Sequence, residues 1–264
     1  MKWGILVFFV IFLSLLSESA GAQYSETVRS GRPGQSIDPF GVGKGIFQVQ
    51  SGVDYFSYNI KASDNRGHGV LHNTVIRYGV AELFEISSLI DYQSESQSIS
   101  GGETTRSGLS AFDLGGRTHI YSGSGLTPSV GFQLRVRVPV LSKDYEIDKL
   151  APRFIIVTSQ NLTQSITLVT NTGASWNGVD DMATGHYVVN LSFPLAGKWG
   201  AFIENYGNFG SGKFETRFDS GFAFLANNDL QFDILGGYGS NKGRKDYFIS
   251  VGVSCRTKGN SGFE

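Results

Sequence analysis

The sequence carries little charge for its length. Charged residues make up 17% of the 264 positions, and 22 basic residues are balanced by 23 acidic ones. An ordinary soluble domain carries about 25% charged residues. A nearly neutral chain also lacks the basic surface with which proteins bind nucleic acid. The composition therefore argues against nucleic acid as a partner and against an ordinary soluble domain.

The usual signatures of metal, cofactor and catalytic sites are also absent from the sequence. Its single cysteine, Cys255, excludes an internal disulfide framework and a zinc–cysteine cluster. No HExxH, P-loop or CxxC motif occurs. A barrel-embedded lipid hydrolase would need a serine activated by a histidine, and none of the four histidines lies in a recognisable Ser/His motif. We therefore expect no catalytic residue, no metal and no cofactor, and keep a hydrolase as a remote alternative.

Glycine and aromatic residues are abundant instead. There are 35 glycines, 20 phenylalanines and 11 tyrosines. Glycine thus reaches about 13%, close to twice its usual share of about 7%. Low charge with many aromatic residues favours a protein of many strands with one face in an apolar phase.

The first residues have the pattern of an export signal. Lys2 precedes an apolar run from Trp3 to Leu16, and the small residues Ala20-Gly21-Ala22 follow. This is the three-part pattern of a cleaved secretory signal. The apolar run is too short for a membrane anchor, which needs about 20 apolar residues. We expect residues 1–22 to be removed, and no later stretch approaches 18 apolar residues.

Beyond about residue 45, apolar residues alternate with polar ones. Such a period of two puts one set of side chains on each face of a strand. Most of the segments have 10 to 13 residues, the length of a transmembrane strand and about twice that of a typical globular one. Twelve segments are predicted, at about 46–56, 69–79, 83–93, 109–121, 128–138, 153–162, 164–174, 185–194, 198–207, 214–225, 230–239 and 246–255. The prediction is an all-β fold, a 12-stranded antiparallel up-and-down transmembrane barrel over residues 46–256.

The connections between these segments alternate in length. Those after the even-numbered segments are short, with one to six residues, and four of the others are long: 57–68, 94–108, 139–152 and 175–184. Outer-membrane barrels have short periplasmic turns and longer outer loops. The alternation therefore predicts a bacterial outer-membrane protein with both termini in the periplasm.

The charged residues of the strands fall on the face opposite the apolar one. An Arg or Lys facing lipid at the midplane costs about 2–4 kcal/mol, so this face should line the lumen. Two interpretations stay open: a lining that selects a solute, or a salt-bridged filling of the barrel. The lumen residues so predicted are Glu85, Asp91, Asp113, Arg117, Arg135, Arg137, Glu204, Glu215, Arg217, Asp219 and Asp233.

The polar stretch 23–45 has two prolines and five glycines and is not a comfortable strand. It could be a plug in the lumen, a segment at the periplasmic mouth or a flexible lead-in. Residues 257–264 form a polar tail after the last strand.

These features resemble a family of outer-membrane proteins named for the MetA pathway of phenol degradation. The resemblance covers residues 30–255. It begins with an Arg-Pro-x-Gln-Ser/Thr stretch and continues through an Arg-Tyr-Gly element, here Arg77-Tyr78-Gly79, and a Gly-x-x-Asp-x-x-x-Gly-Lys/Arg element from Gly108 to Arg117. Glu204 and Asp233 fit later acidic positions of the pattern. The N-terminal positions that fit it are Arg32, Pro33, Gln35, Ser36, Pro39, Gly45, Gln48, Gly52 and Tyr55.

The resemblance implies an outer-membrane channel or transporter for small solutes, hydrophobic compounds among them. The chain departs from the family in having Gly31, Gly34 and Gln50 where acids are common, and in lacking a terminal aromatic residue on the last strand. The main alternative is a structural or adhesive surface protein with a plugged lumen. The partners expected are outer-membrane lipids, lipopolysaccharide, the barrel-assembly machinery and a small solute that the sequence does not identify.

Overall fold

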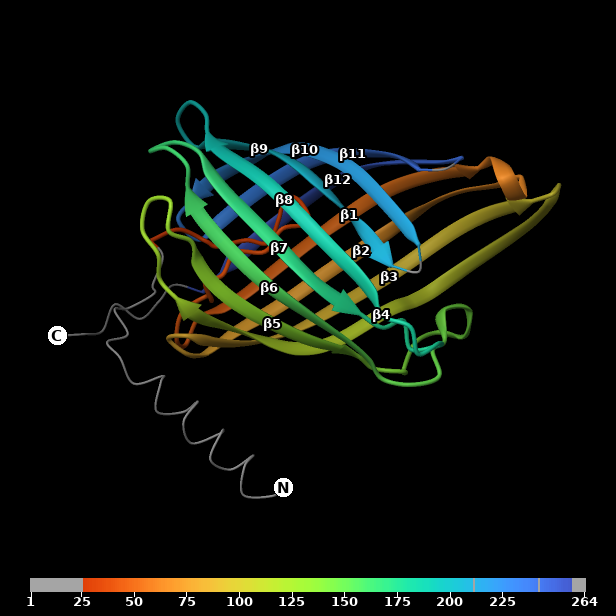
Figure 1. The fold of residues 1–264 in the computed structure, drawn as a ribbon, viewed down its shortest axis with the longest axis horizontal. Coiled ribbons are helices and arrows are strands. Elements are labelled where there is room, and N and C mark those ends of the chain that lie inside the picture. Colours follow the sequence, from red (N-terminus) through yellow and green to blue (C-terminus); the bar gives the residue numbers. More distant parts are fainter. Residues whose placement is uncertain (1–25, 211, 242, 258–264) are drawn as a thin grey trace, which may run out of the picture.

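The chain forms a closed antiparallel barrel of twelve strands, as predicted (Figure 1). The computed structural model describes residues 26–210, 212–241 and 243–257, so the expected export signal lies outside the described residues. Each strand pairs with its neighbours in sequence, and β1 pairs with β12 to close the barrel. The strands are β1 (Phe47–Ile60), β2 (Asn65–Ala81), β3 (Phe84–Ile99), β4 (Gly102–Tyr121), β5 (Ser129–Arg137), β6 (Ala151–Asn161), β7 (Thr167–Ser175), β8 (Thr184–Pro194), β9 (Trp199–Gly210), β10 (Lys213–Asn227), β11 (Leu230–Asn241) and β12 (Arg244–Arg256).

The outward face of the barrel is apolar and the inward face is polar. On β10, Phe218 is 62% exposed while the next residue, Asp219, is 4% exposed. Phe214 and Phe222 continue the outward row, and every strand except β7 contributes exposed large apolar side chains of this kind. An apolar band that runs around the outside of a barrel marks a surface that meets lipid. The alternation in the sequence therefore identifies the two faces correctly.

Two of the predicted long loops are strand hairpins. β1 continues to Ile60 and β2 begins at Asn65, with only the 3₁₀ turn η2 (Lys61–Ser63) and Asp64 between them. β3 and β4 likewise extend to Ile99 and from Gly102, so the predicted loops 57–68 and 94–108 are wrong. These ends are polar on both faces, and the apolar alternation that marks a membrane strand stops before the strand pairing does.

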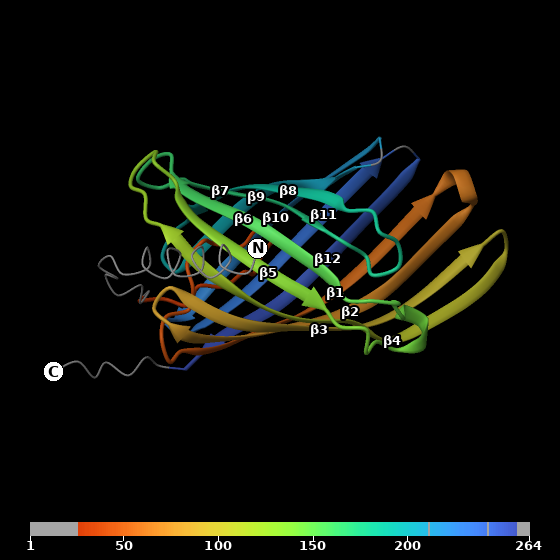
Figure 2. The same ribbon diagram turned by 60° about the horizontal axis from the view of Figure 1, so that its bottom comes forward.

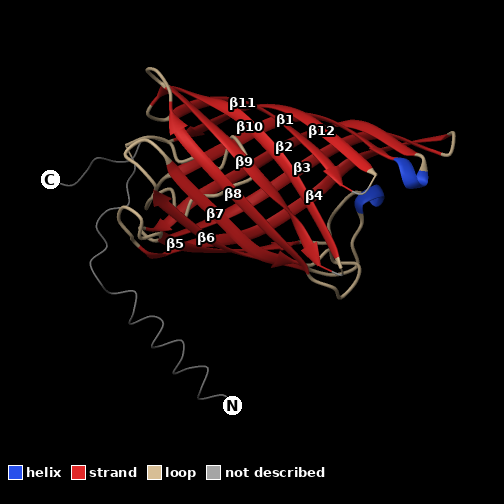
Figure 3. Ribbon diagram, turned by 45° about the horizontal axis from the view of Figure 1, so that its top comes forward, coloured by secondary structure: helices blue, strands red, loops and turns tan. Residues whose placement is uncertain are grey.

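The hairpins β1–β2 and β3–β4 project beyond the other strands at one end of the barrel (Figure 2). Polar contacts between strands support them: Tyr58 Oη donates to Glu95 Oε1 at 2.6 Å, and Arg106 pairs with the same carboxylate at 2.9 Å. The remaining connections at this end include residues 138–150, which contain the short helix η3 (Lys143–Tyr145), and residues 176–183 (Figure 3).

The opposite end carries the short connections and both ends of the described chain (Figure 1). Val28 N donates to Asn228 O at 2.7 Å in the β10–β11 turn, and Thr257 N donates to Phe47 O at 2.8 Å. Within the described ranges, no helix has the length and apolar character needed to cross a bilayer.

Candidate functional site: the lumen and its N-terminal segment

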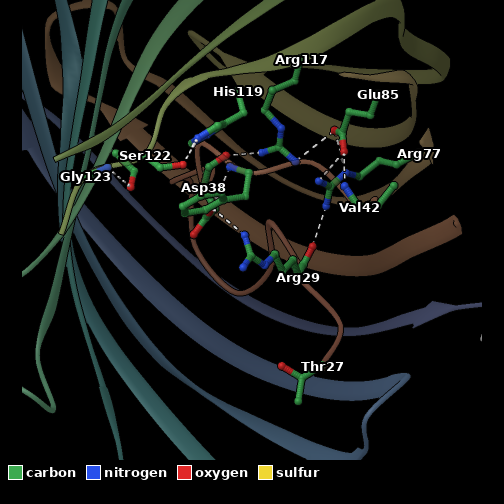
Figure 4. A network of polar contacts seen from close by, with 12 residues as sticks. Thr27, Arg29, Asp38, Val42, Arg77, Glu85, Arg117, His119, Ser122 and Gly123 are labelled. Carbon is green, nitrogen blue, oxygen red and sulfur yellow. Dashed lines mark hydrogen bonds and ion pairs between the residues drawn. The ribbon is translucent and has the colours of Figure 1, made fainter. Parts of the chain in front are cut away.

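The residues that precede β1 cross the interior of the barrel. This N-terminal segment, residues 26–46, begins at the β10–β11 turn and contacts strands on several sides of the lumen before it enters β1. Figure 4 shows its contacts with Arg77, Glu85 and Arg117. At its middle, Ile37 N donates to Asn171 Oδ1 at 2.8 Å and Ile37 O accepts from Asn171 Nδ2 at 3.0 Å. Because prolines interrupt it, the segment does not extend the sheet and is held by side chains of the wall.

Glu85 on β3 is the centre of the first group of attachments. Its carboxylate is 1% exposed and accepts from Arg77 Nη2 at 2.7 Å and Arg117 Nη2 at 3.0 Å. The same carboxylate accepts the backbone N–H of Val42 at 2.9 Å. Two charge-assisted arginine pairs and a backbone donor thus saturate a buried carboxylate, which avoids the cost of an unpaired one.

The two arginines of this group also bind the segment's backbone (Figure 4). Arg77 Nη1 donates to Arg29 O and Arg117 Nη1 donates to Asp38 O, both at 2.6 Å. Nearby, Phe40 stacks on the ring of His119, with the ring centres 4.7 Å apart. The side of the wall formed by β2 to β4 therefore fixes the segment near its start, at Arg29, and near its end, at Val42.

Glu204 on β9 holds the middle of the segment from the opposite side. It accepts the consecutive backbone N–H groups of Gln35 at 2.7 Å and Ser36 at 3.0 Å. Asn190 Nδ2 donates to the same carboxylate at 3.0 Å. Two successive N–H groups pointing at one carboxylate form an anion-binding turn. Here the turn is in the segment and the anion is in the wall.

Arg32 occupies a slot in the wall built by two glycines. Its guanidinium donates to Asp233 Oδ1 at 3.1 and 3.2 Å and to Ser250 Oγ at 2.6 Å. Gly52 and Gly252 are paired in register on β1 and β12, and a Cβ on them would lie 2.3 and 2.2 Å from the guanidinium. A side chain at either glycine would displace the Arg32 guanidinium from this place.

The remaining predicted lumen residues also lie on the inward face but do not all touch the segment. Asp113 pairs with Arg137 at 2.7 Å, and Arg217 pairs with Asp246 at 2.8 Å and with Glu215 at 3.6 Å. Asp91 accepts a hydrogen bond from Asn73, and the buried Asp219 lies opposite Glu204 in the β9–β10 register. The side chain of Arg135 has no hydrogen bond among the described residues.

Several of the N-terminal motif positions attach the segment to the wall. Gln35 and Ser36 bind Glu204 through their backbone, Gln48 Nε2 donates to Arg29 O at 2.9 Å, and Pro39 lies against Gly131. Pro33 follows Arg32 and lines the cavity at the short-turn end.

Sequence analysis did not select several residues that bind the segment, among them Arg77, Asn171 and Gln231. Arg77 belongs to the Arg-Tyr-Gly element, and its side chain lies on the same face of the sheet as that of Gln48, its partner in the strand register. Asn171 and Gln231 are single polar residues on inward positions, and their role depends on the path of the segment.

The segment borders each of three cavities in the lumen. One of about 600 Å³ lies at the short-turn end and includes Thr27, Val28 and Ser30 in its lining. One of about 610 Å³ lies toward the projecting hairpins and includes Gln35. A third, of about 310 Å³, lies between the segment and the wall formed by β1 to β6. The segment therefore divides the interior of the barrel.

A serine–histidine contact lies on the outward face. His68 and His72 both belong to β2, although His68 falls within the predicted loop 57–68. Ser51 Oγ on β1 lies 2.9 Å from His72 Nε2 and 3.1 Å from Thr74 Oγ1. Sequence analysis missed this pair because its members are 21 residues apart and become neighbours only through the strand register.

A lipid-facing barrel with a charged lumen and an internal segment defines the chain as an outer-membrane type of β-barrel protein. The family described as "Putative MetA-pathway of phenol degradation" matches residues 30–257, and the chain belongs to this family. The predicted resemblance is thereby confirmed. A search of curated proteins found no match to the chain.

Solved structures share the fold at low sequence identity. An outer membrane channel from Pseudomonas putida F1 is 11% identical, with a TM-score of 0.68 and coverage of 86% of this chain and 100% of that one. The translocator domain of an autotransporter, NalP from Neisseria meningitidis, is 13% identical (TM-score 0.52, coverage 81% and 89%). A porin, KdgM, solved in complex with disordered oligogalacturonate, is 11% identical (TM-score 0.52, coverage 77% and 98%).

Proposed function

We propose that the protein is an outer-membrane channel or transporter for small solutes, hydrophobic ones among them, and that its N-terminal segment must leave its docked position for solute to pass. The main support for this proposal is the way the segment is attached. The segment divides a polar lumen, but side chains of the wall hold it only through hydrogen bonds and ion pairs to its backbone and to Arg32. Such contacts can be broken and remade without unfolding the barrel, whose strands are paired all the way round.

The fold shared with an outer-membrane channel over 86% of the chain supports this proposal, and so does the family. In this proposal the protein is not an enzyme. Its surroundings are outer-membrane lipids and lipopolysaccharide, the barrel-assembly machinery inserts it, and the predicted lumen charges act in two ways. Glu85, Arg117, Glu204 and Asp233 hold the segment, and the others line the route of the solute.

Single-channel conductance in planar bilayers tests the proposal. Residues 23–264 are compared with a chain that lacks residues 23–45, and heat-modifiable migration shows that each has folded. Rare openings of the full chain and steady conductance of the shortened one are expected. If both folded proteins stay silent, the lumen is a permanent filling, and the structural or adhesive alternative replaces the channel.

The contact between Ser51 and His72 favours a second candidate, a lipid hydrolase on the outward face. A hydroxyl within hydrogen-bond distance of an imidazole is the first requirement of an activated nucleophile. Among the described residues no carboxylate or amide is bonded to the other ring nitrogen of His72, so the orienting third member is not in place. Release of fatty acid from phospholipid vesicles by the wild type, lost in Ser51→Ala and kept in Thr74→Ala, would establish this candidate.

A further inference from the structure

Two arginines of the lumen face each other without a partner. Arg135 on β5 and Arg153 on β6 are directly opposite in the register, and both line the cavity of about 310 Å³. Among the described residues neither side chain forms a hydrogen bond or an ion pair, and the Nε of Arg135 is buried without a partner. Like charges opposite each other across two strands are destabilising. Arg135 is partly buried and Arg153 is exposed to the lumen, so an anion that reaches the cavity could bind between the two like charges.

Three of the four acids that line this cavity are hydrogen-bonded to other side chains. Asp113 acts on both arginines through its charge, but its carboxylate is hydrogen-bonded to Arg137 at 2.7 Å. Glu85 is saturated by Arg77 and Arg117, and Asp91 accepts from Asn73. Six arginines and four acids line the cavity, the fourth acid being Asp54 on β1. Positive charge therefore exceeds negative charge in the lining, and among the described residues no acid is bonded to Arg135 or Arg153.

The pair lies on the loop side of the N-terminal segment. Gly131 contacts Pro39 of the segment, and Arg135 follows four residues later along β5 toward the connection 138–150. Ile155 belongs to the apolar cluster against which Ile37 packs, and Arg153 precedes it by two residues, again toward that connection. A solute that enters from the loop end would meet the two guanidinium groups before it reaches the segment.

We propose that Arg135 and Arg153 form a subsite for the carboxylate of a small organic anion. Planar guanidinium groups match the two oxygens of a carboxylate. Apolar side chains border the same cavity, namely Leu71, Val75, Leu89 and Ile155, and they suit the apolar body of such a solute. This inference rests on the proposed channel function and specifies the class of its substrate.

Isothermal titration calorimetry on the detergent-folded full chain tests the subsite, with benzoate as the probe and benzamide as its neutral analogue. Arg135→Gln and Arg153→Gln are compared with the wild type. Arg66→Gln is the matched control, because Arg66 is an exposed arginine on β2 outside this cavity. Folding of each variant is checked by heat-modifiable migration.

The wild type and the Arg66 variant should bind benzoate more tightly than benzamide, and each lumen variant should bind benzoate about 10- to 100-fold more weakly, the worth of one charged hydrogen-bonding partner. Equal binding of benzoate and benzamide by the wild type, or unchanged benzoate binding in Arg135→Gln and Arg153→Gln, would overturn the subsite. Conductance is recorded separately on the same proteins. A wild type that conducts but does not prefer benzoate refutes only the subsite, and one that prefers benzoate but never conducts refutes only the channel.

Discussion

Removal of the Arg32 side chain should release the N-terminal segment. Arg32 is the one attachment in which a segment side chain enters the wall of the barrel between two glycines. Its side chain is 11% exposed and the Asp233 side chain is 0% exposed, so solvent screens the pair little. In Arg32→Ala the Asp233 carboxylate would stay in the wall without its partner whenever the segment is docked.

The loss of the Arg32–Asp233 ion pair sets the size of the expected effect on the docked state of the segment. Removing one member of a buried ion pair costs about 3–5 kcal/mol, because the other charge is left uncompensated. The cost falls on the docked state, since release of the segment opens Asp233 to the water of the lumen. The equilibrium between docked and released segment should therefore shift by roughly 100- to 5,000-fold toward release.

Single-channel recording measures this shift as the fraction of time spent open. Arg32→Ala should be open far more often than the wild type at the same unitary conductance. Arg32→Ala combined with Asp233→Asn should be less open than Arg32→Ala alone, because the double variant leaves no buried charge. Arg66→Ala, which removes an exposed arginine of the outer hairpin, is the control and should behave as the wild type.

An Arg32→Ala protein that folds and shows the wild-type open fraction would refute the reasoning. It would mean either that the segment is held equally well by Glu85 and Glu204 alone or that conduction does not involve the segment.

Three further expectations follow from the same structure. Gly252→Ala should raise the open fraction as Arg32→Ala does, because its Cβ would lie 2.2 Å from the Arg32 guanidinium, and an unchanged open fraction would contradict the slot. Phe222→Arg, on the lipid face near the middle of β10, should cost about 2–4 kcal/mol of folding free energy in a urea titration in vesicles, whereas Leu126→Arg in a short turn should cost about 0–1 kcal/mol. In the connection 176–183, a hydrogen bond from Asn177 lowers the pKa of Asp180. This contact should therefore order the loop when the pH is above the ordinary carboxyl pKa, and it should be lost as the pH falls through the lowered pKa of Asp180. Nuclear magnetic resonance titration should show the pKa of Asp180 rising toward 3.8 in Asn177→Ala.

Most of the barrel could be predicted from the sequence, because alternation is a local signal. On β10 the aromatic residues face outward and Asp219 faces inward, as expected. The membrane-spanning portions were predicted well because burial in lipid imposes that pattern. The extensions of β1 to β4 were missed because above the bilayer both faces meet water and the pattern ends.

The site was predictable only in part. The lumen charges follow from the strand faces, but their partners depend on the path of a segment without periodicity. Nothing in the spacing of Arg32 and Asp233, 201 residues apart, links them before the barrel closes. The pairing of Arg135 with Arg153, and that of Ser51 with His72, likewise depends on the strand register, which a single sequence does not fix.

The most direct test of the central claim is a reversible tether of the segment. Ser30 Oγ and Ser254 Oγ lie 2.6 Å apart, so cysteines at these two positions, in a Cys255→Ser background, should form a disulfide that keeps the segment, and Arg32 two residues later, at the wall. Conductance is recorded on one protein before and after addition of a reductant. We expect the oxidised protein to be silent and the reduced protein to open like the Cys255→Ser parent. Equal conductance in the oxidised and reduced states would contradict the claim that the segment must move for the channel to open.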